Sequence, residues 1–116
     1  MRFINIFTHE PTTRPPTEAE MAAMGKLVEE GMKAGWLIAT EGVSFGGTAV
    51  RVHKASSGKV TVTDGPFAET KEAIGGYALL RAANRDEVVA LTRSFLNAVG
   101  QGTCEIHQLY EMPTKE

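Results

Sequence analysis

The chain has 116 residues and a formal net charge of −2 at pH 7, and 42% of its residues are hydrophobic. This length predicts one domain over residues 1–116, with a core over 1–111 and a frayed tail over 112–116. The slight negative charge argues against nucleic-acid binding, and apolar runs far shorter than about 20 residues argue against a membrane role. The start lacks a signal-peptide pattern, and the single cysteine, Cys104, fits a reducing compartment, so we expect a cytoplasmic protein.

The first third of the chain predicts a strand, a helix and a second strand. Residues 2–8 have the composition of a strand, and three prolines after them mark a loop. Thr17 is a natural N-cap with Glu20 three residues later, and apolar residues from Met21 to Met32 recur at helical spacing before Gly35. The sequence therefore predicts a helix over 18–34 with this methionine-rich stripe in the core, followed by a strand over 36–40.

A β-hairpin is predicted next. Residues 48–54 and 59–63 flank a short turn that contains Gly58. Alternation places four valines on one face of this hairpin, with Arg51 and His53 on the other. The valines are Val50, Val52, Val60 and Val62. An isolated hairpin is marginally stable in water, so we expect the valine face to pack on another surface.

The last third of the chain repeats the first pattern. Residues 77–82 predict a strand, Asn84 and Glu87 mark the start of a second helix, and residues 103–111 predict a final strand. The sum is β-α-β, a hairpin, then β-α-β. Helices on one side of a mostly antiparallel sheet leave its other side uncovered, and a second subunit would cover it. We therefore expect a homodimer.

The segment between the hairpin and the strand at 77–82 is the strongest candidate for a functional motif. Pro66 restricts the backbone of Gly65 before it, which predicts a stiff turn. Asp64 either shapes this turn or acts in ligand binding or proton transfer. Phe67 fits a core position better than a stacking role, and the charged residues after it fit a solvated surface as well as a site. The motif comprises Asp64, Gly65, Pro66, Phe67, Glu69, Lys71 and Glu72.

Residues 62–72, with Ile74 to Tyr77 after them, closely resemble the signature of the DGPF branch of the YCII-related proteins. Segments 35–38 and 104–111 also occur in the expected order, so the resemblance covers nearly the whole chain. It implies a ferredoxin-like α+β sandwich that assembles as a dimeric α/β-barrel, with a cleft between or beside the sheets. It implies no settled activity. Relatives in this branch are often associated with extracytoplasmic-function sigma factors, which implies a regulatory protein partner as an alternative.

Two positions depart from the pattern of that family. Its better-studied members are proposed to use a histidine on the first helix, and the helix predicted at 18–34 contains none. The DGPF branch usually carries an arginine on the last strand where His107 stands here. A permanent positive charge is thereby replaced by one that titrates near neutral pH.

Strand alternation selects the remaining site candidates. Glu105 and His107 share one face of the last strand, and Tyr77 and Arg81 share one face of an earlier strand. If the first-strand row of Phe3, Asn5 and Phe7 faces the same side, the non-helical face of the sheet carries a ligand cleft. In this interpretation Asp64 and His107 are the catalytic candidates and Arg81 holds an anion. The predicted substrate-binding residues are Phe3, Asn5, Phe7, Tyr77, Arg81 and Glu105.

Plainer interpretations stay open beside this one. Glu105 and His107 can be ordinary strand neighbours, and Arg81 can form an interface salt bridge. We expect His9 and His53 to be exposed. The sequence shows no metal-ligand spacing, cofactor fingerprint or activated cysteine, so no metal and no cofactor are predicted. Three functions remain: a small-molecule-binding protein or enzyme, a regulatory partner of a sigma-factor-linked protein, and a structural dimer.

Overall fold

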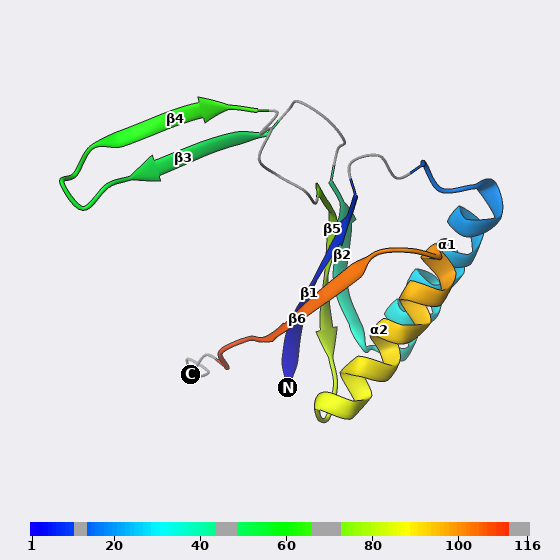
Figure 1. The fold of residues 1–116 in the computed structure, drawn as a ribbon. Coiled ribbons are helices and arrows are strands. Elements are labelled where there is room, and N and C mark those ends of the chain that lie inside the picture. Colours follow the sequence, from blue (N-terminus) through cyan, green and yellow to red (C-terminus); the bar gives the residue numbers. More distant parts are fainter. Residues whose placement is uncertain (11–13, 44–48, 66–72, 112–116) are drawn as a thin grey trace.

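The protein is described here from a computed structural model that covers residues 1–10, 14–43, 49–65 and 73–111. The predicted order of strands and helices is confirmed in these ranges (Figure 1). The elements are β1 (Arg2–His9), α1 (Glu18–Ala34), β2 (Leu37–Gly42), β3 (Val50–Lys54), β4 (Val60–Asp64), β5 (Ala73–Arg81), α2 (Arg85–Val99) and β6 (Thr103–Gln108).

Both helices begin at the caps that the sequence predicts. The Thr17 hydroxyl accepts a hydrogen bond from the Glu20 backbone N–H at 3.1 Å, and the Glu20 carboxylate accepts one from the Thr17 N–H at 2.9 Å. This capping box satisfies two N–H groups that the first turn of α1 leaves without helical partners. Gly35 ends α1 at φ 85°, a conformation that favours glycine. Neither α1 nor α2 is long and apolar enough to cross a membrane.

Four strands form an antiparallel sheet in the order β2-β5-β1-β6, and both helices lie on one of its faces (Figure 1). This is the ferredoxin-like α+β arrangement, with β1 and β5 in the centre. The buried core lies between the helices and the sheet, where it is shielded from water. It consists of Phe3, Leu37, Leu80, Ala82 and Val88.

The methionine-rich stripe of α1 is less buried than the sequence predicts. Met21 is 59% exposed and Met32 is 47% exposed, whereas Met24 and Leu27 are half-buried. Gly31 is the buried residue of α1, and a Cβ there would stand 2.7 Å from the Trp36 ring. The helix therefore contacts the rest of the protein along a narrow strip, and the flanks of the predicted stripe remain in solvent.

Strands β3 and β4 form a separate two-stranded ribbon that projects from the body on the side of the sheet away from the helices (Figure 1). Val52 pairs with Val62, and Arg51 pairs with Thr63, so the predicted valine face is confirmed. Every residue of both strands is exposed. The projection helps to raise the Cα radius of gyration to 16.6 Å, against about 13 Å for a compact chain of this length.

Candidate functional site

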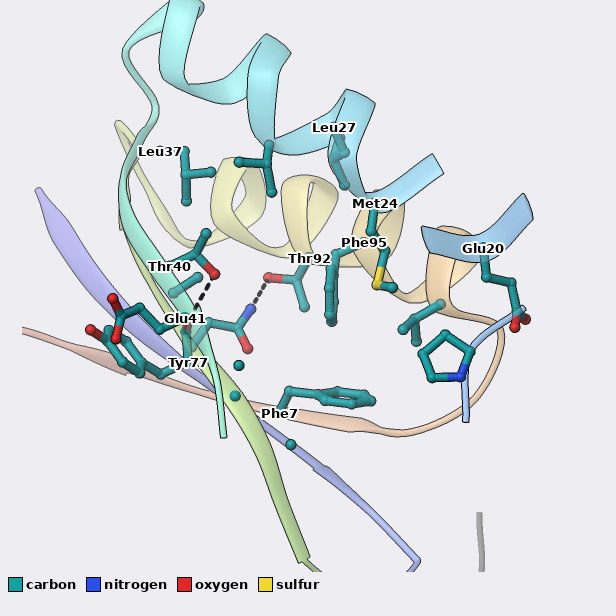
Figure 2. Close-up of a pocket in the computed structure, with 18 of the residues that line it drawn as sticks. Phe7, Glu20, Met24, Leu27, Leu37, Thr40, Glu41, Tyr77, Thr92 and Phe95 are labelled. Carbon is teal, nitrogen blue, oxygen red and sulfur yellow. Dashed lines mark hydrogen bonds between the residues drawn. The ribbon is translucent and has the colours of Figure 1, made fainter. Parts of the chain in front are cut away.

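A cavity of about 510 Å³ lies between the helical face of the sheet and the two helices. Figure 2 shows Met24, Leu27 and Phe95 projecting into it from the helices, with Phe7 across from them on β1. Most of its walls are apolar, which is typical of sites for small molecules. The lining residues include Asn5, Phe7, His9, Arg14, Glu20, Met24, Leu27, Thr40, Leu91, Thr92, Phe95 and Val99.

Phe7 forms the floor of the cavity because the neighbouring strand carries glycine beside it. A Cβ on Gly75 would stand 2.7 Å from Cδ2 of Phe7 and 2.9 Å from Cδ2 of His9, closer than these atoms can approach. Glycine therefore allows the Phe7 ring to lie against the strand, a use typical of glycine inside a sheet. Phe7 also meets Phe95 of α2 edge to face, with ring centroids 5.3 Å apart and planes at 86°.

A buried polar pair interrupts the apolar wall. The Asn5 amide on β1 donates a hydrogen bond to the Thr92 hydroxyl on α2 at 2.9 Å, and that hydroxyl donates to the Val88 carbonyl at 2.8 Å. Asn5 is 5% exposed and Thr92 is 6% exposed. Because hydrogen bonds in such surroundings are scarcely screened by water, the pair fixes β1 against α2. It also places polar atoms beside the cavity.

An ion pair lines the solvent end of the cavity. The Arg14 guanidinium donates to both carboxylate oxygens of Glu20, at 2.7 and 3.1 Å. The hydrogen bond from Arg14 and the one from the Thr17 N–H lower the pKa of Glu20 to about 2. Arg14 is 63% exposed at its side chain, against 19% for Glu20. Both side chains are therefore charged at neutral pH, and their opposite charges leave the pair with a net charge close to zero.

His9 lines the cavity as well, and the prediction that it is exposed is wrong. It is 7% exposed, because β1 continues one residue beyond the predicted strand and keeps His9 on the face of Phe7. The Nδ1 atom lies 2.8 Å from the Glu10 carbonyl, which can only accept, so Nδ1 carries a proton. His53, in contrast, is exposed on the ribbon, as predicted.

Cys104 is half-buried on the helical face, opposite Phe7 in the register of β1 and β6. Burial raises the pKa of its thiol to about 11, and a hydrogen bond with Asn5 opposes that shift. The thiol is therefore neutral near pH 7. No group of three histidine, cysteine or carboxylate side chains in the described ranges is arranged to hold a metal ion.

The sequence profile of the YCII-related domain matches residues 1–113. The chain belongs to the YCII-related family. It is also 40% identical, over 63 residues, to an uncharacterized protein of Rhizobium meliloti (strain 1021). That match covers 53% of this chain and 51% of the relative, so the aligned part spans about half of each protein. Family membership brings no established activity, and the DGPF branch remains a prediction.

In this YCII-related protein the first-strand row does not face the side that the sequence analysis supposed. Asn5 bonds to α2 and Phe7 packs on α2, so the row of Phe3, Asn5 and Phe7 points toward the helices. The prediction that it shares the non-helical face with Glu105 and His107 is wrong. Asn5 and Phe7 do line a cavity, but that cavity lies on the helical side.

The other four candidates share the non-helical face as predicted. Tyr77 pairs with Ile6 and Arg81 pairs with Arg2, while Glu105 and His107 pair with Ile6 and Ile4. Figure 2 shows Tyr77 on the side of the sheet away from the helices. His107 Nε2 lies 2.6 Å from the Glu105 carboxylate, and the side chains are 56% and 71% exposed. Their roles in binding or catalysis stay predictions.

Asp64 lies apart from this face. It ends β4 on the exposed ribbon, opposite Val50, whereas His107 lies on β6 of the four-stranded sheet. Gly65 follows and donates its N–H to the Ala49 carbonyl at 2.7 Å. The remaining motif residues, Pro66, Phe67, Glu69, Lys71 and Glu72, lie outside the described residues, as does the predicted tail at 112–116. The role of the motif therefore stays a prediction.

The sequence analysis missed Thr92, Arg14 and Glu20 as site residues. Thr92 follows Val88 by four residues on the buried stripe of α2, and a polar residue there signals a buried hydrogen-bond partner. Glu20 was recognised only as a capping residue. Its partner Arg14 stands in a proline-rich segment without periodicity, so no sequence pattern pointed to that pair.

Proposed function

We propose that this YCII-related protein binds a small, largely apolar molecule that carries hydrogen-bonding groups, and that it does so between the sheet and the helices. The observation that carries the proposal is the cavity of about 510 Å³, since small-molecule sites usually measure about 300–1,000 Å³. Its apolar walls supply contact area. The Asn5 and Thr92 pair and the solvent-end Arg14 and Glu20 pair supply polar contacts that would orient a ligand.

The lining favours binding over covalent chemistry. Of the polar lining residues, Asn5 and Thr92 offer hydrogen bonds but no activated nucleophile, His9 has its Nδ1 bonded to the Glu10 carbonyl, and the nearby Cys104, outside the lining, is held neutral by burial. The proposed protein is therefore a ligand-binding protein or sensor. A free, half-buried thiol also supports the proposed cytoplasmic location, where thiols stay reduced.

A thermal-shift screen of a metabolite panel tests this proposal with two matched tryptophan variants. Met24→Trp fills the cavity from α1, whereas Met21→Trp adds the same ring at a position that is 59% exposed. A ligand at about 100 times its Kd should stabilise the wild type by roughly 2.7 kcal/mol, or raise Tm by about 10 °C.

We expect the shift to survive in Met21→Trp and in His107→Ala and to vanish in Met24→Trp. Loss in His107→Ala alone would return the site to the non-helical face. If no compound in the panel raises Tm while all variants are folded, the pocket is rejected as a ligand site. The search would then turn to the sigma-factor-linked partner that the family resemblance implies.

We also propose that the protein is a homodimer through its non-helical face. The register divides this face into three rows across the strands. One end row carries Glu41 and Glu105, the middle row carries Ile4, Leu79 and His107, and the far row carries Arg81 and Arg2, whose guanidinium lies 3.5 Å from the Glu111 carboxylate. A two-fold axis along the middle row places the glutamate row of each copy opposite the arginine row of the other and brings the two middle rows together. This complementarity supports a symmetric pair.

Charge reversal tests the proposed dimer. Glu105→Lys and Arg81→Glu should each weaken dimerisation at low salt, because each sets like charges facing across the two-fold axis. The double variant should recover affinity. Light scattering during size-exclusion chromatography measures the dimer fraction, and equal dimerisation by all four proteins would contradict the proposed arrangement of rows.

A further inference from the structure

The valine face of the β3–β4 ribbon is apolar between Lys54 and Asp64 at its two ends and lacks cover in the described part of the chain. Val50, Val52, Val60 and Val62 are 55%, 65%, 56% and 63% exposed. The face opposite them carries Arg51, Thr63, His53 and Thr61. A two-stranded ribbon of this kind is marginally stable alone in water, so its valine row requires a packing surface.

The area of the proposed dimer interface indicates what covers the ribbon. Four strands about 4.8 Å apart, with about six residues each, make a sheet face of roughly 400 Å². Stable pairs bury about 800 Å² of surface on each partner. The two ribbon strands have five residues each, which adds about 160 Å² of flat area from the same spacings. The ribbon would therefore add about 40% to the flat contact area that the sheet face offers to a second copy.

The direction of the ribbon is consistent with this role. It leaves the body beyond the Glu41 end of the sheet and projects to the non-helical side, where the second copy would lie (Figure 1). The two-fold axis favoured by the charged rows places the Arg2 end of the second copy next to the Glu41 end of the first, where the ribbon leaves the body. There Arg2 donates to the Tyr110 carbonyl at 3.1 Å, and Tyr110 is 93% exposed. An exposed aromatic ring thus stands at that end of the second copy, on the β6 edge, across the sheet from the β2 edge near which the ribbon starts.

We propose that the β3–β4 ribbon is a dimerisation arm, which packs its valine face on the Tyr110 end of a second copy of this chain. The inference rests on the proposed homodimer and adds a second contact to it. Because the pair is two-fold symmetric, each arm holds the other copy, and every substitution in the arm acts twice.

The test compares substitutions on the two faces of the arm. Val52→Thr with Val62→Thr keeps β-branched side chains but makes the valine face polar. His53→Thr is the matched control on the opposite face. We expect the valine pair to raise the dimer Kd by about 100-fold or more, and Tyr110→Ser to raise it by about 10-fold, with the control close to wild type. Circular dichroism and thermal unfolding check that each variant folds.

Amide hydrogen exchange supplies a second readout on the wild type. Over a roughly 1,000-fold range of protein concentration, β3 and β4 should gain protection together with dimer formation. A dimer that forms normally while the valine pair leaves its Kd unchanged would overturn the arm and leave the sheet-face dimer standing. Protection of the ribbon that does not depend on concentration would also overturn it, because the cover would then be intramolecular. A wild-type protein that stays monomeric throughout would reject both the dimer and the arm.

Discussion

Thr92→Val tests the polar pair that fixes β1 against α2. Valine keeps the branched shape of threonine but removes the hydroxyl that accepts from Asn5 at 2.9 Å and donates to the Val88 carbonyl at 2.8 Å. The carbonyl retains its place in the helix, whereas the N–H of the Asn5 amide that bonds Thr92 loses its acceptor, and the hydrogen bond of Asn5 with Cys104 remains. With Asn5 only 5% exposed, water has little access to replace that hydrogen bond.

The expected cost follows from that geometry. Leaving a buried donor unsatisfied costs about 1–3 kcal/mol, more than the net contribution of an ordinary hydrogen bond. For a chain of 116 residues the unfolding entropy is about 0.24 kcal/mol/K, so each kcal/mol lowers Tm by about 4 °C. Thr92→Val should therefore lower Tm by roughly 4–12 °C.

Chemical denaturation and calorimetry measure this change, with two comparisons. Ser94→Ala on the same helix removes a hydroxyl that donates to the Ala90 carbonyl at 3.3 Å at an exposed site, and should cost less than about 0.5 kcal/mol. The double variant Asn5→Leu with Thr92→Val leaves no orphaned amide, so it should be less destabilised than the two single changes predict together. A Thr92→Val protein as stable as wild type would refute the structural role of the pair.

Three further predictions concern other contacts. Because the pKa of Glu20 falls from its ordinary 4.5 to about 2, the contribution of its charged form to folding stability is complete above about pH 4.5 and is lost toward pH 2. The difference in unfolding free energy between wild type and Glu20→Gln, measured by urea unfolding, should therefore shrink as the pH falls through that window. A difference that stays constant with pH would contradict this prediction. Gly31→Ala should destabilise the protein by about 1–3 kcal/mol, since its Cβ would meet Trp36 at 2.7 Å. Gly25→Ala on the same helix meets nothing within 4 Å and should stabilise the protein by about 0.5–1 kcal/mol. Equal changes in Tm for the two variants would contradict this packing. Cys104, with a thiol pKa of about 11, should react with a maleimide near pH 8 much more slowly than free cysteine, and equal rates would contradict its burial.

The helix boundaries and the order of helices and strands along the chain could be predicted because local chemistry specifies them. Thr17 with Glu20, Asn84 with Glu87, and Gly35 each fix a helix end through contacts within a few residues. The ribbon face was predictable for a similar reason, because Val52 and Val62 alternate with polar residues. In the ribbon, one face of the alternating pattern is clearly apolar.

The face of β1 could not be predicted in this way. Phe3 and Phe7 lie on one face of β1, and Ile4 and Ile6 lie on the other. Because both faces carry large apolar side chains, alternation does not indicate which row faces the helices. Asn5 was interpreted as a polar residue at an exposed cleft, whereas Thr92 on α2 compensates its burial. The contact spans 87 residues of sequence, and a single chain gives no local sign of it.

The measurement that tests the central claim most directly is a ¹H–¹³C methyl spectrum of the protein titrated with the compound that stabilises it most in the thermal screen. The proposed site predicts that the methyl signals of Met24, Leu27 and Leu91, which line the cavity, shift with saturation. Leu79 and Ile4, on the opposite face of the sheet, should stay unchanged. Shifts confined to Leu79 and Ile4 would contradict the account and place the ligand on the non-helical face.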